Sequence, residues 1–145
     1  DLFMHTKLQP LLEANDNFYT AFESMTMSSM VAIWARRAED CCIHPGWEIL
    51  NGWPEIRESW RAIFANTNYM RIELDEVSAE IMGPVGRVIC VENIFTIIDS
   101  QTIHSRVACT NLFLKIDDRW KLVLHQGSPI ASQQVSTSNV DLDLN

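Results

Sequence analysis

Three polar side chains stand inside segments that are otherwise apolar, and they are the residues best suited to chemistry. His44 ends a short apolar stretch, Asn111 interrupts a long one, and His125 lies within the last one. A buried polar group without hydrogen-bond partners costs about 1–3 kcal/mol. Each is therefore either a hydrogen-bonded core residue or a group that faces a pocket. An imidazole in an apolar pocket suits general acid–base catalysis, because its pKa lies near neutrality.

Aromatic residues support a pocket. The expected lining consists of four tryptophans between residues 34 and 60 and two further rings: Trp34, Trp47, Trp53, Trp60, Tyr19 and Phe113. An indole has an N–H that needs a partner even when its ring is buried. Such rings either fill a core or wall a concave apolar pocket with a few polar groups, which is the usual form of a small-molecule site. The sequence leaves both interpretations open.

Metal and nucleophilic chemistry have weaker support. From a strand, Cys42 and His44 would point the same way and Cys41 the opposite way, so only two metal ligands converge locally. No G-x-S-x-G motif is present. The cysteines form no C-x-x-C pair, so we expect Cys41, Cys42, Cys90 and Cys109 to be reduced thiols. We expect no metal and no cofactor.

Two carboxylates near these residues could orient an imidazole. Asp40 lies beside the short stretch that ends at His44, and Glu92 lies within a long apolar segment. Both could equally face solvent.

The composition describes one domain with no nucleic-acid partner. The chain has 145 residues, of which 47% are apolar, enough for a core that needs no disulfide or metal. The formal charge of -8 opposes binding to nucleic acid or to an anionic membrane. No apolar run approaches the ~20 residues of a membrane span. Residues 1–15 lack the pattern of a signal peptide, so we expect a cytoplasmic protein, although the start at Asp1 leaves open that an upstream segment was removed.

The hydrophobic period predicts the elements that position these side chains. Helical spacing predicts helices over residues 8–23, 27–34 after an N-cap at Thr26, and 54–65. Residues 40–44 and 47–50 are predicted to be short extended segments. From residue 70 the period is two, which predicts a bulge near Asp75 and strands over residues 70–82, 87–99, 102–116 and 120–128.

The two central predicted strands are apolar at nearly every position. One solvated face in an antiparallel meander would instead give alternation. Both faces are therefore expected to be covered, one by helices and the other by a second subunit, which predicts a homodimer through the sheet. Residues 131–145 are polar and aperiodic, and we predict a mobile C-terminal tail after a single domain of residues 1–130.

The order of elements and several local strings resemble the NTF2-like superfamily, and more narrowly its SnoaL-like, ketosteroid-isomerase-like domains. The strings are Asn17–Phe22, Met30–Trp34, His44–Trp47, Asn51–Trp53, Ser59–Trp60, Thr110–Phe113 and Trp120–Pro129. The resemblance implies an α+β, cystatin-like cone in which three helices pack on a strongly curved, mostly antiparallel sheet around one open pocket. It also implies a homodimer. This scaffold hosts isomerases, dehydratases, cyclases and non-catalytic binding proteins, so it does not fix a function.

The residues used by ketosteroid isomerases are not kept at the matching positions. The position of the Asp base holds His44, that of the Tyr holds Phe18, and the later acid falls near Thr110 or Asn111. A histidine at the base position can still remove a proton.

Three functions are expected in order. The first is binding of a small hydrophobic molecule in the cone pocket, oriented by His44 and Asn111. The second is an enzyme of the isomerase, dehydratase or cyclase type acting on a hydrophobic carbonyl compound, with His44 as the base and Asn111 or His125 stabilising the enolate. The third is a dimeric protein-interaction module.

Overall fold

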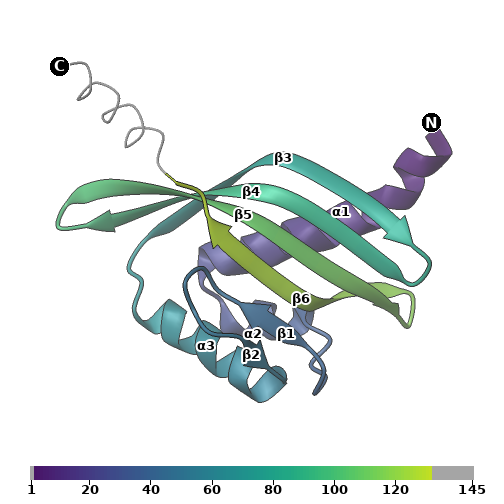
Figure 1. Cartoon of the computed structure of the whole chain (residues 1–145), viewed down its shortest axis with the longest axis horizontal. Helices are drawn as coiled ribbons and strands as arrows, with labels where there is room; N and C mark the ends of the chain where they lie inside the picture. The colour runs from purple at the N-terminus through teal and green to yellow at the C-terminus, as the bar shows by residue number, and fades with distance from the viewer. Residues whose placement is uncertain (1, 132–145) are drawn as a thin grey trace.

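The fold is a strongly curved sheet wrapped around three helices (Figure 1). The computed structural model describes residues 2–131, with side chains from Thr6 onward. The predicted tail covers residues 131–145, of which 132–145 lie outside the described residues, so it stays a prediction. The helices are α1 (Leu2–Ser24), α2 (Met27–Ile33) and α3 (Trp53–Ala65). The strands are β1 (Cys41–Ile43), β2 (Leu50–Asn51), β3 (Met70–Met82), β4 (Val85–Ile98), β5 (Gln101–Ile116) and β6 (Arg119–Pro129).

The strands form one sheet in the order β2-β1-β6-β5-β4-β3. Strands β3 to β6 form the predicted antiparallel meander, and β1 lies parallel to β6. The predicted bulge is confirmed, because the β3–β4 register shifts between Asp75 and Ser78. Glu76 takes a φ of 53° there, which lets one face of β3 give way to the other. The fold is therefore the α+β arrangement expected from the sequence.

The first helix begins earlier than its predicted start at residue 8. It begins at Leu2, so Pro10 lies inside the helix and not near its first turn. The fixed φ of proline fits a helix although the residue has no N–H to donate. The apolar stripe of α1 faces the concave side of the sheet, where Leu11 and Phe18 are fully buried.

The two shorter helices begin without side-chain caps. Thr26 is the N-cap of α2, as predicted, but its hydroxyl pairs with Ser24 Oγ at 2.9 Å and not with a helix N–H. Gly52 precedes α3 with a φ of 89°, a conformation that glycine adopts without strain, and Pro54 lies in the first turn. The Asn51–Gly52 pair therefore starts a helix, as predicted, and does not turn a hairpin.

Close approach of α1 to the sheet depends on Gly86 of β4. A Cβ at this position would lie 2.6 Å from Leu11 Cδ1 and 3.2 Å from Trp120 Cζ3. At the other end of the cone, the parallel register places Cys42 of β1 opposite His125 of β6. The sheet thus places two segments that are far apart in the sequence side by side. Within the described residues, no helix is long and apolar enough to span a membrane.

Candidate active site

A network of hydrogen-bonded polar side chains, called here the polar network, lies on the inner face of the sheet, buried against α1. The β5–β6 register places Asn111 directly opposite His125. Glu92 extends from β4, and Tyr19 approaches from α1. All four side chains are buried.

The hydrogen bonds of Asn111 determine which groups donate and which accept in the polar network. Its Nδ2 donates to Asn15 Oδ1 at 2.9 Å and to the Tyr19 hydroxyl at 3.2 Å. Its Oδ1 therefore accepts from Nδ1 of His125, 2.7 Å away. Tyr19 in turn donates to Glu92 Oε2 at 2.5 Å. His125 consequently carries its proton on Nδ1 and a lone pair on Nε2.

Burial sets the charges of these groups. It lowers the pKa of His125 to about 3, with the neighbouring His44 as a smaller cause. Burial also raises the pKa of Glu92 above its ordinary value, against the hydrogen bond from Tyr19. Burial, followed by the Glu92 charge, raises the pKa of Tyr19 well above its ordinary value, so the phenol keeps its proton. His125 is therefore a neutral imidazole at pH 7.

His44 is held in the opposite tautomer. The hydroxyl of Ser59 donates to the Ile56 carbonyl at 2.7 Å, so its oxygen accepts from Nε2 of His44 at 2.8 Å. The lone pair of His44 therefore lies on Nδ1. Burial lowers the pKa of His44 to about 4, so this imidazole is also neutral at pH 7.

Both imidazoles meet the indole of Trp60. The ring centroids of His44 and His125 are 6.2 Å apart, and Trp60 lies 4.8 Å from the first and 5.8 Å from the second. The Trp60 Nε1 atom is buried and has no hydrogen-bond partner among the described residues. Two ring nitrogens with lone pairs and one uncommitted N–H thus share one region of the cone.

The expected ring lining divides into separate groups. Tyr19 and Trp60 belong to the site, and Trp47 covers His44 with its ring centroid 4.7 Å away while remaining 44% exposed. Trp34 and Trp53 instead pack on each other, with ring centroids 6.1 Å apart. Phe113 is buried in the hydrophobic core.

The tryptophan-walled open hollow expected from the sequence is closed in the structure. Trp34, Trp60 and Phe113 are wholly inaccessible to water. Rings from α1 fill the space, because Phe18 and Phe22 both pack edge-on against Trp60. Two cavities elsewhere on the described residues are lined by other side chains.

Sequence reasoning missed two residues that fix the site. Asn15 lies one helical turn before Tyr19 on α1, and Ser59 precedes Trp60 on α3. The available signal was a polar residue one turn before the predicted lining residue Tyr19 and another directly beside the predicted lining residue Trp60. Of the two carboxylates considered, Glu92 joins the site, whereas Asp40 is bound to Arg37 Nε at 2.7 Å and to backbone N–H groups.

Glu92, Cys109 and His125 are the group among the described residues that comes nearest to a metal site. Each offers a ligand atom, and these atoms lie within 4.8 Å of one another. The proton on His125 Nδ1 is committed to Asn111, and Tyr19 is bonded to Glu92. The observed hydrogen bonds therefore use the atoms that a metal would require, and we assign no metal role.

The curved sheet, the three enclosed helices and the polar residues on the inner face define a cystatin-like fold of the NTF2-like superfamily. A family model for the SnoaL-like domain matches residues 11–132. The chain belongs to the SnoaL-like domain family.

Two solved structures share about a third of their residues with this chain. A putative dehydratase from the NTF2-like family of Streptomyces avermitilis is 31% identical, with a TM-score of 0.81 over 88% of this chain and 99% of that one. A putative calcium/calmodulin-dependent protein kinase type II association domain from Thiobacillus denitrificans is 32% identical, with a TM-score of 0.74 over 81% of this chain and 93% of that one.

A more distant structure shows the fold alone. The NTF2-like superfamily protein from Salmonella enterica serovar Typhimurium is 18% identical, with a TM-score of 0.80 over 90% of this chain and 95% of that one. No curated protein matches the chain.

Proposed function

We propose that the chain is an acid–base enzyme of the dehydratase or isomerase type that acts on a small hydrophobic carbonyl compound inside the cone. The observation that carries this proposal is the meeting of two neutral imidazoles with the unpartnered N–H of Trp60. A protein that only binds its ligand does not need two neutral imidazoles beside an unpartnered N–H group. The similarity to the Streptomyces avermitilis protein supports the same reaction class.

His44 is the proposed base. Its Nδ1 lone pair would take a proton from the carbon beside the substrate carbonyl, while Ser59 holds the proton on Nε2. The resulting imidazolium would then return the proton to a new carbon, giving an isomer, or to a departing hydroxyl, giving water and an alkene. Each route leaves the imidazole neutral again.

The donor for the developing enolate oxygen differs from the one expected from the sequence. Both N–H groups of Asn111 are already bonded, and the single N–H of His125 is bonded to Asn111. Trp60 Nε1 is an uncommitted donor whose ring contacts both imidazoles, so we assign it this role. One preorganised donor of this kind is worth about 3–4 kcal/mol in a dry site.

His125 is proposed to position the substrate. Its free Nε2 lone pair would accept a hydrogen bond from a substrate hydroxyl. The bonds through Asn111 and Tyr19 to Glu92 prevent the ring from turning and fix its tautomer. Glu92 thus acts on the substrate through other residues.

Substrate entry is proposed to occur beside Trp47. This ring covers His44 yet is half exposed, and it lies next to Gly46, which has a φ of 83°. Displacing it would uncover His44, and the rings that fill the cone would have to separate for a substrate to reach Trp60 and His125. The aromatic surroundings favour an apolar substrate.

Proton exchange tests the proposal without knowledge of the natural substrate. A panel of hydrophobic ketones and β-hydroxy ketones in deuterated buffer is followed by NMR for loss of the α-proton and for alkene formation. We expect exchange with the native protein and at least a hundredfold slower exchange with His44→Gln. His104→Gln is the matched control, because His104 lies on the outer face with Nε2 3.0 Å from Asn93 Oδ1. Saturable tryptophan quenching by these ketones without any exchange would contradict catalysis and leave the binding function.

We also propose that two copies pair through the outer face of the sheet. Ile89 of β4 is 40% exposed there, between two neighbours turned inward, Val88 and Cys90. The Thiobacillus denitrificans relative is named as an association domain.

The four free cysteines support the expected cytoplasmic location.

A further inference from the structure

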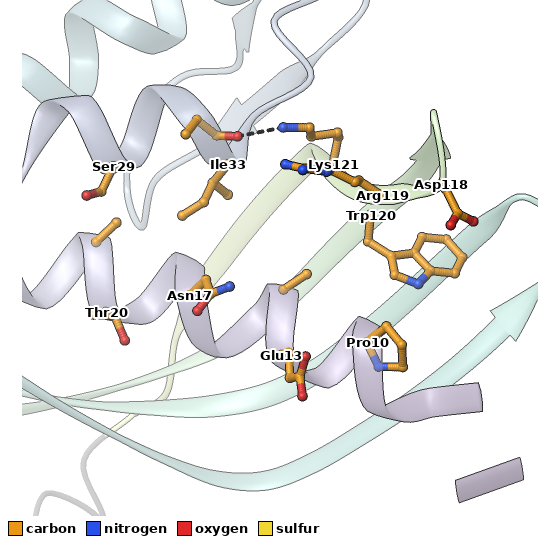
Figure 2. A pocket seen from close by; sticks show the side chains of 13 residues that line it. Pro10, Glu13, Asn17, Thr20, Ser29, Ile33, Asp118, Arg119, Trp120 and Lys121 are labelled. Carbon is orange, nitrogen blue, oxygen red and sulfur yellow. Dashed lines mark hydrogen bonds between the residues drawn. The ribbon is translucent and has the colours of Figure 1, made fainter. Parts of the chain in front are cut away.

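A cavity lies outside the cone, between α1, α2 and the turn from β5 to β6 (Figure 2). Its volume is about 530 Å³, within the range of ligand sites. Pro10, Ala14 and Trp120 supply apolar walls, and Arg119 and Lys121 supply charge. None of the residues assigned to the proposed active site lines this cleft.

Three cations gather at this cleft without acidic partners. Arg119 and Lys121 line it, and Arg36 lies close enough for its charge, with that of Arg119, to lower the pKa of Lys121 after the effect of burial. Among the described residues, none of the three forms an ion pair within 4.0 Å. Such a grouping is unexpected in a chain with a formal charge of -8. Lys121 Nζ donates a hydrogen bond to the Ala32 carbonyl oxygen at 2.9 Å.

The acidic residues of the cleft do not neutralise these cations. Asp118 pairs with Lys115 at 3.9 Å, and Figure 2 shows its carboxylate apart from the Arg119 guanidinium. Glu13 accepts a hydrogen bond from Gln9 at 3.4 Å. The side of the cleft that faces α2 therefore carries uncompensated positive charge.

We propose that this cleft binds a small amphipathic anion. An aromatic or aliphatic body would lie against Trp120 and Pro10, and a carboxylate or sulfonate would pair with Arg119 and Lys121. Apolar wall and charge lie side by side, so both ends of such a ligand are satisfied at once. A neutral ligand would leave the like charges facing one another.

A matched pair of fluorescent probes tests this site. The anion 8-anilinonaphthalene-1-sulfonate and its neutral counterpart N-phenyl-1-naphthylamine share the same ring system. We expect the native protein to bind the sulfonate saturably at one site per chain and at least tenfold more tightly than the neutral amine. Added salt should weaken only the sulfonate.

Variants assign the effect to the cleft. Arg119→Gln and Arg119→Gln/Lys121→Gln should weaken the sulfonate by about threefold and tenfold or more, respectively, and leave the neutral probe unchanged. Arg57→Gln is the control, because Arg57 is an exposed cation of α3 that also forms no ion pair within 4.0 Å in the described part of the chain. Circular dichroism melting checks that each variant folds. Equal affinity for the two probes, or an unchanged sulfonate affinity in the folded Arg119→Gln variant, would overturn the proposal.

Discussion

The protonation of His125 is decided by side chains from three elements. His125 donates to Asn111 on β5. Asn111 donates to Tyr19 on α1, and Tyr19 donates to Glu92 on β4. Because the amide of Asn111 has a donor end and an acceptor end, its two donated bonds leave its oxygen to accept, from Nδ1 of His125 at 2.7 Å and from Cys109 Sγ at 3.4 Å. Loss of any member of the polar network should therefore disturb the imidazole ring of His125.

Replacing Tyr19 by Phe should destabilise the protein by about 1–3 kcal/mol, because Glu92 would lose its donor in a buried setting. Urea unfolding at pH 7 measures this change. The same substitution at the chain's other tyrosine is the control: Tyr69 is 43% exposed and should change stability by less than about 0.5 kcal/mol. Equal effects at the two positions would contradict the hydrogen bonds assigned to Tyr19 in the polar network.

Acid should destabilise the protein below pH 6.5 through its two buried imidazoles. Their pKa values fall from 6.5 when unfolded to about 4 for His44 and about 3 for His125. Between these values the unfolded chain binds more protons, so stability rises with pH and levels off above 6.5. Each imidazole should contribute roughly 2 kcal/mol to the loss between pH 7 and pH 4.5. The raised pKa of Glu92 acts in the opposite direction, because protonating this buried carboxyl favours the folded state.

Urea unfolding across this pH range measures the slope. His125→Gln should flatten it, whereas His104→Gln, which alters a histidine on the outer face, should leave it unchanged. A slope that is the same in all three proteins would mean that the buried imidazoles are not the titrating groups.

At the scale of elements, periodicity and turn residues predicted most of the fold. The bulge near Asp75, the start of α3 after Gly52 and the four-strand meander all follow from local pattern. The start of α1 was wrong because proline is tolerated within this helix, where its position was taken as a boundary. The parallel pairing of β1 with β6 is a long-range contact, and periodicity carries no information about it.

The site was only partly predictable for the same reason. Polar residues in apolar segments indicated His44, Asn111 and His125, which the structure places in one cone. The tautomers depend on Ser59 and Asn15, whose partners lie on other elements. Whether rings line a hollow or fill it depends on packing volumes, and these cannot be derived from residue type.

Gly86→Ala tests the contact between α1 and β4. The new Cβ would lie 2.6 Å from Leu11 Cδ1, so we expect a loss of about 1–3 kcal/mol in unfolding free energy. Leu11→Ala alone should also destabilise, by about 2–5 kcal/mol, because the side chain is fully buried. The double variant should lose clearly less than the sum, because removing the leucine makes room for the methyl. Strict additivity in this cycle would show that Leu11 does not limit the space at Gly86.

At the scale of the whole molecule, the proposed pairing of two copies through the outer face of the sheet can be tested by one charge. Ile89→Lys should convert the proposed dimer into a monomer, because the charge would be buried without a partner. Light scattering after size exclusion gives the mass. Ile98→Lys is the control, since Ile98 is 57% exposed near the tip of the β4–β5 hairpin. A native chain that is monomeric at micromolar concentration would contradict pairing through the sheet.

The pairing of β1 with β6 also bears on biosynthesis. On the ribosome, β1 emerges long before its parallel neighbour β6 has been translated. The same holds for Trp34, whose bridge partner is Leu122 of β6. His44 and His125 can come together only after nearly the whole described chain has left the exit tunnel. A nascent chain arrested before Arg119 would already contain all three helices but would leave β1 without its parallel neighbour, a state for chaperones to shield.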